Sequence, residues 1–195
     1  MSYHVYHTEA LILGSLPSGE GDRLIFCYTR ELGLVMANAR SIRESRSRLR
    51  YILQTFAHAE IDLIRGKYGW KLISARPLRS FAHIWEHKEK RQILAQSTTL
   101  LRRLVQGEER HAELFDDLLS GLGFLHEVET ETELRSLELL FAVRMLSGLG
   151  YWGTEEEFAS LVCDEGWCRS SLELLTASRP AVLSSVNQAL KETQL

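Results

Sequence analysis

The first part of the chain alternates short apolar stretches with turn residues. Residues 56–64, F-A-H-A-E-I-D-L-I, alternate apolar and polar positions, which is typical of a strand with one buried face. Four more stretches are rich in aliphatic, aromatic and β-branched residues and end at turns containing glycine, proline or serine. The five predicted strands cover residues 8–16, 23–30, 34–39, 56–64 and 70–75.

Five short strands without an intervening helix predict a small barrel, because closure removes the unpaired edges of a short sheet. The oligonucleotide-binding (OB) barrel is the common five-stranded case. An SH3-like barrel is the alternative on strand count alone. The segment 40–50 joins the third and fourth predicted strands, a place where OB barrels often carry an extra element.

Beyond residue 80 the apolar positions recur at three-, four- and seven-residue steps, which predicts helices over 83–105 and 111–126. Thr130 and Glu133 have the spacing of a capping box, and the helix that follows, 134–149, is apolar over most of its surface. Such a helix is expected at the centre of a bundle. Shorter helices are predicted over 154–162, 170–177 and 180–192. We therefore expect an α+β protein, with an OB-fold barrel over 1–80 and an all-α domain over 81–195.

The composition is that of a globular protein, with 45% hydrophobic and 25% charged residues. No apolar run approaches the roughly 20 residues that cross a bilayer. The first residues, M-S-Y-H-V-Y-H-T-E, lack the basic start and apolar run of a secretory signal, so we expect a cytoplasmic protein. The three cysteines, Cys27, Cys163 and Cys168, do not form a disulfide framework and offer at most half of a structural zinc site.

The net charge of −3 conceals an asymmetry between the two predicted domains. Residues 1–80 contain 12 lysines and arginines against 7 acids, a net charge of +5. The remaining residues contain 11 against 19, a net charge of −8. The first domain can therefore meet an anionic partner that the second would repel.

The strongest concentration of positive charge is residues 39–51, A-R-S-I-R-E-S-R-S-R-L-R-Y, where five arginines face one acid. A folded core cannot hold that many unpaired guanidinium groups, so the segment must be solvated. Arginines bind nucleic-acid phosphates without regard to sequence. We expect a loop that becomes ordered on DNA. The predicted nucleic-acid-binding residues are Arg23, Arg30, Arg40, Arg43, Arg46, Arg48, Arg50, Lys67, Trp70 and Lys71.

OB barrels also stack single-stranded bases on aromatic rings. Tyr28, Tyr51, Tyr68 and Trp70 are candidates for that role, and the alternative for each is a place in the barrel core.

Two other classes of function are open from the residues. His83, Glu86 and His87 fit H-x-x-E-H, the pattern of an inverted zinc-protease helix, which would make the chain a metallohydrolase. The arginine segment could instead hold an acidic protein, which would make the chain a protein-only adaptor. No phosphate-binding glycine loop and no set of nucleophile and base is evident, so we expect no enzyme and no small-molecule substrate.

Residues 14–40, G-S-L-P-S-G-E-G-D-R-L-I-F-C-Y-T-R-E-L-G-L-V-M-A-N-A-R, carry a pattern of an acid pair (Glu20 and Asp22), a strand ending in T-x-x-x-G (Thr29 to Gly33) and a basic loop. Further along, M-L-S-G-L-G-Y at 145–151 ends the predicted central helix. In their order and spacing these residues resemble the RecO family of bacterial recombination mediators.

The resemblance implies an OB domain followed by a helical domain, binding of single- and double-stranded DNA, strand annealing, and loading of recombinase onto DNA coated with single-strand-binding protein. The implied partners are the C-terminal tail of that protein and RecR, and the implied location is the nucleoid. Many members carry a four-cysteine zinc module that this chain lacks, so we expect a compact form without a cofactor. Basic residues of the first long helix are candidates for meeting an acidic tail, namely Lys88, Lys90, Arg91, Arg102 and Arg103.

Overall fold

The computed structural model describes residues 4–44, 47–81, 84, 86–153, 156–163 and 166–193. Its internal contacts divide the chain into two compact units. The barrel unit comprises Met1–His83 together with Gln106–Arg110, and the helical unit comprises Ile84–Val105 and His111–Leu195.

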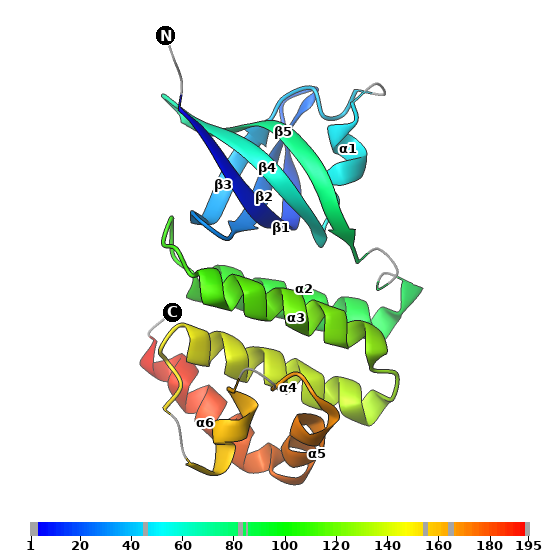
Figure 1. Ribbon diagram of the computed structural model, residues 1–195, viewed down its shortest axis with the longest axis vertical. Helices are drawn as coiled ribbons and strands as arrows, with labels where there is room; N and C mark the ends of the chain where they lie inside the picture. Colours follow the sequence, from blue (N-terminus) through cyan, green and yellow to red (C-terminus); the bar gives the residue numbers. More distant parts are fainter. Residues whose placement is uncertain are drawn as a thin grey trace. The chain divides into compact units, whose positions relative to one another are not determined.

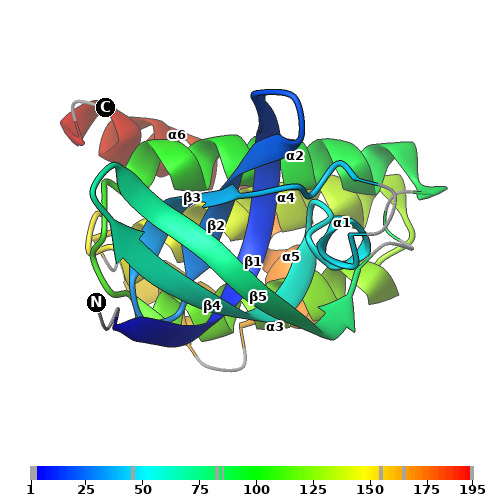
Figure 2. The same cartoon turned by 90° about the horizontal axis from the view of Figure 1, so that it is seen from above.

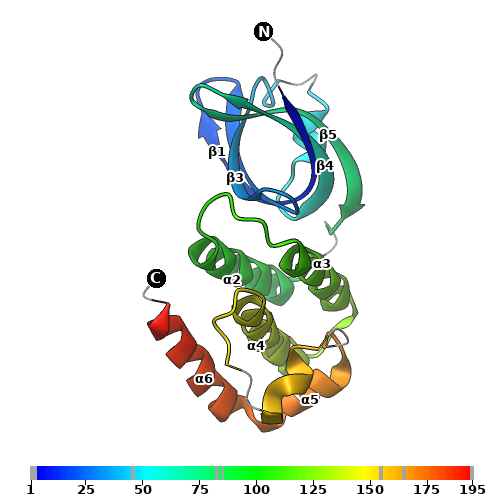
Figure 3. The same ribbon diagram turned by 60° about the vertical axis from the view of Figure 1, so that its left-hand side comes forward.

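Five strands form the barrel unit: β1 (Val5–Ser18), β2 (Asp22–Thr29), β3 (Gly33–Ala39), β4 (Ala57–Gly66) and β5 (Gly69–Ser80). Their order is β1-β2-β3-β5-β4, and β4 pairs with β1, so the sheet closes into the ring seen in Figure 3. All neighbouring strands are antiparallel except β3 and β5, which run parallel. This is the arrangement of an OB barrel, and the predicted fold class is confirmed.

Alternate residues of the strands fill the barrel, since successive side chains of a strand point to opposite faces. Ile12 of β1, Ile25 of β2 and Ile61 of β4 are fully buried in its core. β5 extends beyond the predicted residue 75 and passes through Pro77 to Ser80. The register between β4 and β5 shifts beside this proline, and such a bulge tolerates a residue without an N–H group.

The helix α1 (Leu49–Ile52) lies between β3 and β4 in the chain and packs against β5, as Figure 2 shows. The segment 40–50 therefore joins the third and fourth strands, as predicted.

Residues Gln106–Arg110 belong to the barrel unit although helices precede and follow them in the chain. The Glu108 carboxylate accepts hydrogen bonds from the Trp70 indole N–H at 2.8 Å and from the Arg65 guanidinium at 2.9 Å. These five residues lie within the helical domain predicted over 81–195 but belong to the barrel unit.

The same segment explains the glycine that begins β3. Gly33 has φ +67°, and a Cβ atom added there would overlap the backbone of Glu109. The N–H of the next residue, Leu34, donates to the Gly107 carbonyl at 3.1 Å. Only a residue without a side chain permits so close an approach in this conformation.

The helical unit contains α2 (Lys88–Leu104), α3 (Ala112–Glu127), α4 (Glu131–Gly148), η2 (Glu156–Leu161), α5 (Arg169–Ala177) and α6 (Arg179–Glu192). Within this unit α2 and α3 lie on one side of α4, and α5 and α6 lie on the other (Figures 1 and 3). The prediction of a central helix is confirmed. None of the helices in the described part of the chain has the length and apolar character to span a bilayer.

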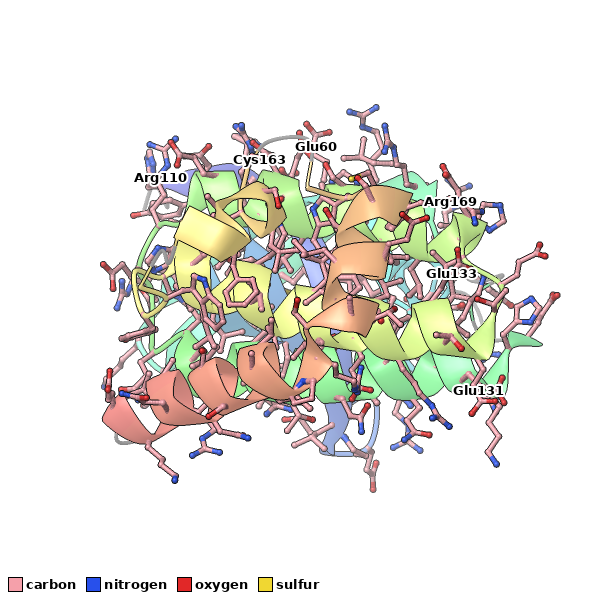
Figure 4. The ribbon with its side chains drawn as sticks, turned by 90° about the horizontal axis from the view of Figure 1, so that it is seen from below. Glu60, Arg110, Glu131, Glu133, Cys163 and Arg169 are labelled. Atoms are coloured by element: carbon pink, nitrogen blue, oxygen red, sulfur yellow. The ribbon has the colours of Figure 1, made fainter. Side chains whose placement is uncertain are left out.

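The predicted capping box at the start of α4 is also confirmed. The Thr130 hydroxyl accepts from the Glu133 N–H at 3.3 Å and donates to the Glu133 carboxylate at 2.7 Å. Arg169, at the start of α5, donates to the other oxygen of that carboxylate at 2.6 Å, and the two side chains lie side by side in Figure 4.

A buried arginine connects α4 to the segment around η2. The Arg144 guanidinium forms a two-pronged ion pair with Asp117 of α3 and donates to the carbonyls of Leu161 at 3.1 Å and Cys163 at 2.6 Å. The Trp167 indole N–H donates to the same Asp117 carboxylate at 2.8 Å. All three nitrogen atoms of this guanidinium therefore donate to protein acceptors.

Two helices begin or form differently from the prediction. α2 starts at Lys88 because His87 has extended backbone angles, with φ −104° and ψ 116°. The helix predicted over 154–162 is a 3-10 helix over Glu156–Leu161. At the end of this helix and beyond it, Arg144 donates to the Leu161 and Cys163 carbonyls, and the Gly166 N–H also donates to the Cys163 carbonyl, at 2.9 Å.

Candidate nucleic-acid interface

The chain between β3 and β4 is bounded by two residues in a left-handed backbone conformation. Ser41 has φ 52° and Phe56 has φ 65°, values that are unusual for residues other than glycine and especially for an aromatic residue. The Ser41 N–H donates to the Asp22 carboxylate at 2.9 Å, and the Phe56 N–H donates to the Ile12 carbonyl at 2.6 Å. Backbone strain of this kind is retained where surrounding contacts fix it, and it occurs often at functional sites.

Apolar residues anchor the same segment to the barrel. Ile42 and Leu53 are 3% and 5% exposed and belong to the barrel core. The Arg43 N–H donates to the Gly21 carbonyl at 3.0 Å, which ties the start of the segment to the β1–β2 turn. The described residues of the segment are thus tied to the barrel at both ends. That the loop becomes ordered on DNA stays a prediction.

A hollow of about 350 Å³ opens at this end of the barrel unit. Its walls carry three arginines from three elements: Arg23 from β2, Arg43 from the turn after β3, and Arg50 from α1. Ile42, Leu53 and Gln54 also line it, and none of the described residues of the lining is acidic.

The three arginines keep their positive charge unneutralised. Arg23 donates to the neutral Ser15 hydroxyl at 3.0 Å. The Arg50 guanidinium lies over the Tyr51 ring, 5.4 Å from its centre. Arg43 and Arg50 form no ion pair with any residue that the structure describes. Since like charges that share a hollow repel one another, an anion bound there is stabilised by all three.

The other predicted residues fall into two groups. Arg40 and Arg48 are exposed in the same segment but do not line the hollow, and Arg46 lies outside the described residues. Arg30 belongs to the opposite end of the barrel, since Arg23 pairs with Ala39 while Thr29, next to Arg30, pairs with Gly33. Lys67 lies in the turn between β4 and β5.

Arg30, Lys67 and Lys71 are weaker candidates for binding nucleic acid. Arg30 lies 3.7 Å from the Glu31 carboxylate, and the Lys67 ammonium is 5.4 Å from the centre of the Tyr68 ring. Lys71 of β5 is half-buried. The structure therefore places Arg23, Arg43 and Arg50 around one hollow, and Arg30, Lys67 and Lys71 are not among the described residues that line it.

Two of the predicted stacking residues are core residues, and that prediction is wrong for them. Tyr28 is fully buried, and Trp70 is 6% exposed. The Trp70 ring packs edge-on against Tyr6, with centres 5.0 Å apart, while Arg65 lies over it at 5.3 Å. Tyr51 and Tyr68 are 65% and 91% exposed and keep free ring surface.

Not every arginine of the barrel is available to an anion. Arg65 is paired with Glu108 at 2.9 Å and Arg76 with Glu60 at 2.6 Å. Neither was among the predicted binding residues. The apolar floor of the hollow was not predicted. Its signal in the sequence is Ile42, a single aliphatic residue among arginines.

Lys90 of α2 is not accessible to an acidic peptide. This lysine is 5% exposed and donates to the His126 carbonyl at 2.9 Å, and burial lowers its pKa. Its prediction as an acid-binding residue is wrong. A groove of about 280 Å³ between α2 and α4 is lined by Glu89, Glu131 and Glu138, which would repel an acidic peptide.

Metal chemistry gains no support from the described residues. Across that part of the chain no three histidine, cysteine or acidic side chains come together as a metal site. Of the H-x-x-E-H pattern, Glu86 and His87 are exposed and His83 lies outside the described residues. Burial raises the pKa of the Cys27 thiol to about 12, which disfavours the thiolate that binds metals.

Comparison with known proteins bears on the barrel first. Residues 1–81 match the family model described as "Recombination protein O N terminal". The barrel unit is therefore similar to the N-terminal part of RecO proteins. The match covers all five strands of the barrel unit.

Individual RecO proteins are similar over a longer part of the chain. A DNA repair protein RecO of Desulfitobacterium hafniense is 30% identical over 147 residues, which cover 75% of this chain and 52% of that protein. The DNA repair protein RecO of Heliobacterium modesticaldum is 33% identical over the same shares of both chains. That of Dehalococcoides mccartyi is 27% identical over 76% of this chain and 57% of its own length. The chain thus spans about half the length of the relatives it matches.

Proposed function

We propose that the barrel unit binds the phosphate backbone of single- and double-stranded DNA at its cationic end. The observation that carries the proposal is the hollow in which Arg23, Arg43 and Arg50 converge, with no acid among the lining residues that the structure describes. Arginine forks match phosphate oxygens and bind them independently of base sequence. Arg40 and Arg48, exposed in the same segment, extend the positive surface around it.

The wider role follows from the RecO relatives, which are named as DNA repair proteins. We infer a mediator of repair and recombination that is not an enzyme, acts at the nucleoid, anneals strands and helps to load recombinase onto DNA coated with single-strand-binding protein. In this proposal the helical unit receives protein partners, namely the tail of single-strand-binding protein and RecR. Annealing of complementary strands coated with that protein is the direct test. Annealing no faster than without the chain would contradict the mediator role.

DNA binding itself is tested by titrating a fluorescent oligonucleotide with the full chain at several salt concentrations. Affinity should fall steeply with salt, because each phosphate contact releases bound counterions. Arg43→Ala and Arg50→Ala should each weaken binding to every sequence and reduce the salt slope by about 1.

Arg76→Ala is the matched control, since it also removes one arginine from the barrel but one already paired with Glu60. It should change affinity and slope little. If Arg43→Ala and Arg50→Ala bind DNA as the unaltered chain does, this end of the barrel is not the DNA site. Tight, salt-sensitive binding of an acidic protein without any binding of DNA would instead support the adaptor function.

A further inference from the structure

The arginines at the cationic end line a half-open hollow and do not form a flat strip. The hollow of about 350 Å³ lies within the range of small-ligand pockets, roughly 300–1,000 Å³. A continuous DNA backbone can be held by charges on an open surface and needs no such space. The terminal group of a DNA strand, by contrast, can enter a hollow from one side.

The charge of the hollow fits a group with more than one negative charge. Arg43 and Arg50 have no carboxylate partner within the described chain, and Arg23 bonds only to the neutral Ser15 hydroxyl. An internal phosphodiester carries one negative charge. A phosphate monoester carries about −1.5 to −2 at neutral pH and offers three acceptor oxygens. Three guanidinium groups therefore match a monoester better than an internal phosphate.

The floor of the hollow suits the nucleotide that bears such a phosphate. Ile42 and Leu53 present apolar surface, and Gln54 presents an amide that both donates and accepts hydrogen bonds. Tyr51, which adjoins Arg50, is 65% exposed and has a ring on which a neighbouring base can stack.

The walls are held in place before any ligand binds. The left-handed residues Ser41 and Phe56 stand at either end of the segment, and their N–H groups bond to Asp22 and Ile12. The Arg43 backbone is bonded to Gly21. A fixed backbone reduces the entropy that ordering the arginines would cost on binding.

From these observations we propose that the hollow binds the terminal phosphate monoester of a DNA strand, with its last nucleotide against Ile42 and Leu53. This inference rests on the proposed binding of DNA by the same end of the barrel unit. It assigns the arginines of the hollow to strand ends, and leaves Arg40 and Arg48 to contact the backbone beyond.

The test compares three forms of one oligonucleotide of about 12 nucleotides, a length that an OB fold can cover. One carries a 5′-phosphate, one a 3′-phosphate, and one hydroxyls at both ends, with an internal fluorophore in each. Fluorescence anisotropy of the full chain should show one phosphorylated form binding roughly tenfold more tightly than the hydroxyl form. Which end gives the effect identifies the polarity of the bound strand.

Variants place the effect in the hollow. Arg43→Ala and Arg50→Ala should bind all three oligonucleotides equally, because the ligands of the terminal phosphate are lost. Arg50→Lys keeps the charge but loses the two-pronged geometry, and should retain only part of the preference. Arg48→Ala is the matched control, with the same loss of charge in the same segment but outside the lining. It should weaken all three alike and keep the tenfold ratio.

Different failures point to different conclusions. Equal affinity of the unaltered chain for the three oligonucleotides, with binding that still depends on salt and Arg43, would overturn the end-recognition and leave DNA binding intact. The absence of binding to any of them would refute the proposed function itself. A hexa-aspartate peptide that displaces the phosphorylated oligonucleotide more effectively than unlabelled oligonucleotide would assign the hollow to an acidic protein, and would overturn the inference as well.

Discussion

Arg144 in the helical unit and Arg50 in the barrel unit carry the same group into opposite surroundings. Arg144 is 7% exposed, forms a two-pronged pair with Asp117 and bonds to two backbone carbonyls. Arg50 is exposed, has no carboxylate partner in the described chain and lines a hollow with two other arginines. The Arg144 guanidinium is thus bound to acceptors within the fold, whereas the Arg50 guanidinium has no carboxylate acceptor among the described residues.

The chain thus contains two kinds of arginine: those paired with an acid within the fold and those without an acidic partner among the described residues. Arg65 and Arg76 resemble Arg144 in being paired, although they are exposed, and they were not expected to bind DNA. A count of positive residues gives all of these arginines equal weight. The partners found in the fold show which of them remain available to an anion.

The largest expected effect is on the buried pair. Arg144→Ala removes the cationic partner of the Asp117 carboxylate, to which the Trp167 indole N–H still donates, and one hydrogen-bond donor from each of the Leu161 and Cys163 carbonyls. We therefore expect a loss of about 3–5 kcal/mol of stability. Urea denaturation measures it. Arg135→Ala, which removes an exposed pair with Glu131 in α4, is the control and should cost less than about 0.5 kcal/mol. Equal losses for the two variants would contradict the structural role of Arg144.

The second prediction concerns the arginines of the hollow, whose replacement should lower DNA affinity and leave stability almost unchanged. Replacing Arg23, Arg43 and Arg50 together with alanine should lower DNA affinity on the order of 100-fold. Stability should change by less than about 0.5 kcal/mol, because these exposed side chains have no acidic partners to lose. Anisotropy titration and urea denaturation of the same preparation measure the two quantities. Loss of stability together with affinity would show that these arginines are structural.

Arg169 lies between the two extremes, since it is exposed but bound to Glu133, which also belongs to the capping box. Thr130→Ala removes that box, and we expect a cost of about 1 kcal/mol. Thr130→Ser keeps the hydroxyl and should recover most of the loss. A thermal melt follows both variants, and an alanine variant as stable as the unaltered chain would contradict the role of the cap.

The smallest effect is a pH dependence at the same place. The Thr130 hydroxyl, with help from Arg169, holds the pKa of Glu133 below its usual value. A carboxyl whose pKa is lower in the folded state stabilises the fold above its unfolded pKa, and this contribution is lost as pH falls through the folded value. NMR titration of the Glu133 side chain should show the lowered pKa, and in Thr130→Ala the pKa should rise toward its usual value. An unchanged pKa in that variant would contradict the assigned cause.

The fold was largely accessible from sequence because its signals are local. The alternation over 56–64 gave β4, and the T-x-x-E spacing at Thr130 gave the start of α4. The unexpected features depend on contacts between distant residues. Arg144 of α4 bonds to the carbonyl of Leu161, 17 residues away, and Gly33 lies against the backbone of Glu109, 76 residues away.

The candidate site was accessible only in part. Composition located the arginine segment, and the arginines it contains are exposed wherever the structure describes them. Composition could not show that Arg23, from another strand, shares a hollow with Arg43 and Arg50, because strand pairing brings them together. Nor could it show that Trp70 is buried, since aromatic residues in strands occur both in cores and on binding faces.

The short segment Gln106–Arg110 has a consequence for the independence of the two units. The chain enters the helical unit after residue 83, returns to the barrel unit for these five residues, and leaves it again at residue 111. A barrel cut off after residue 83 would lose Glu108, and the Trp70 indole and Arg65 would lose their acceptor. The barrel unit is therefore discontinuous in sequence, and neither gene fission nor domain exchange at that boundary would transfer it whole.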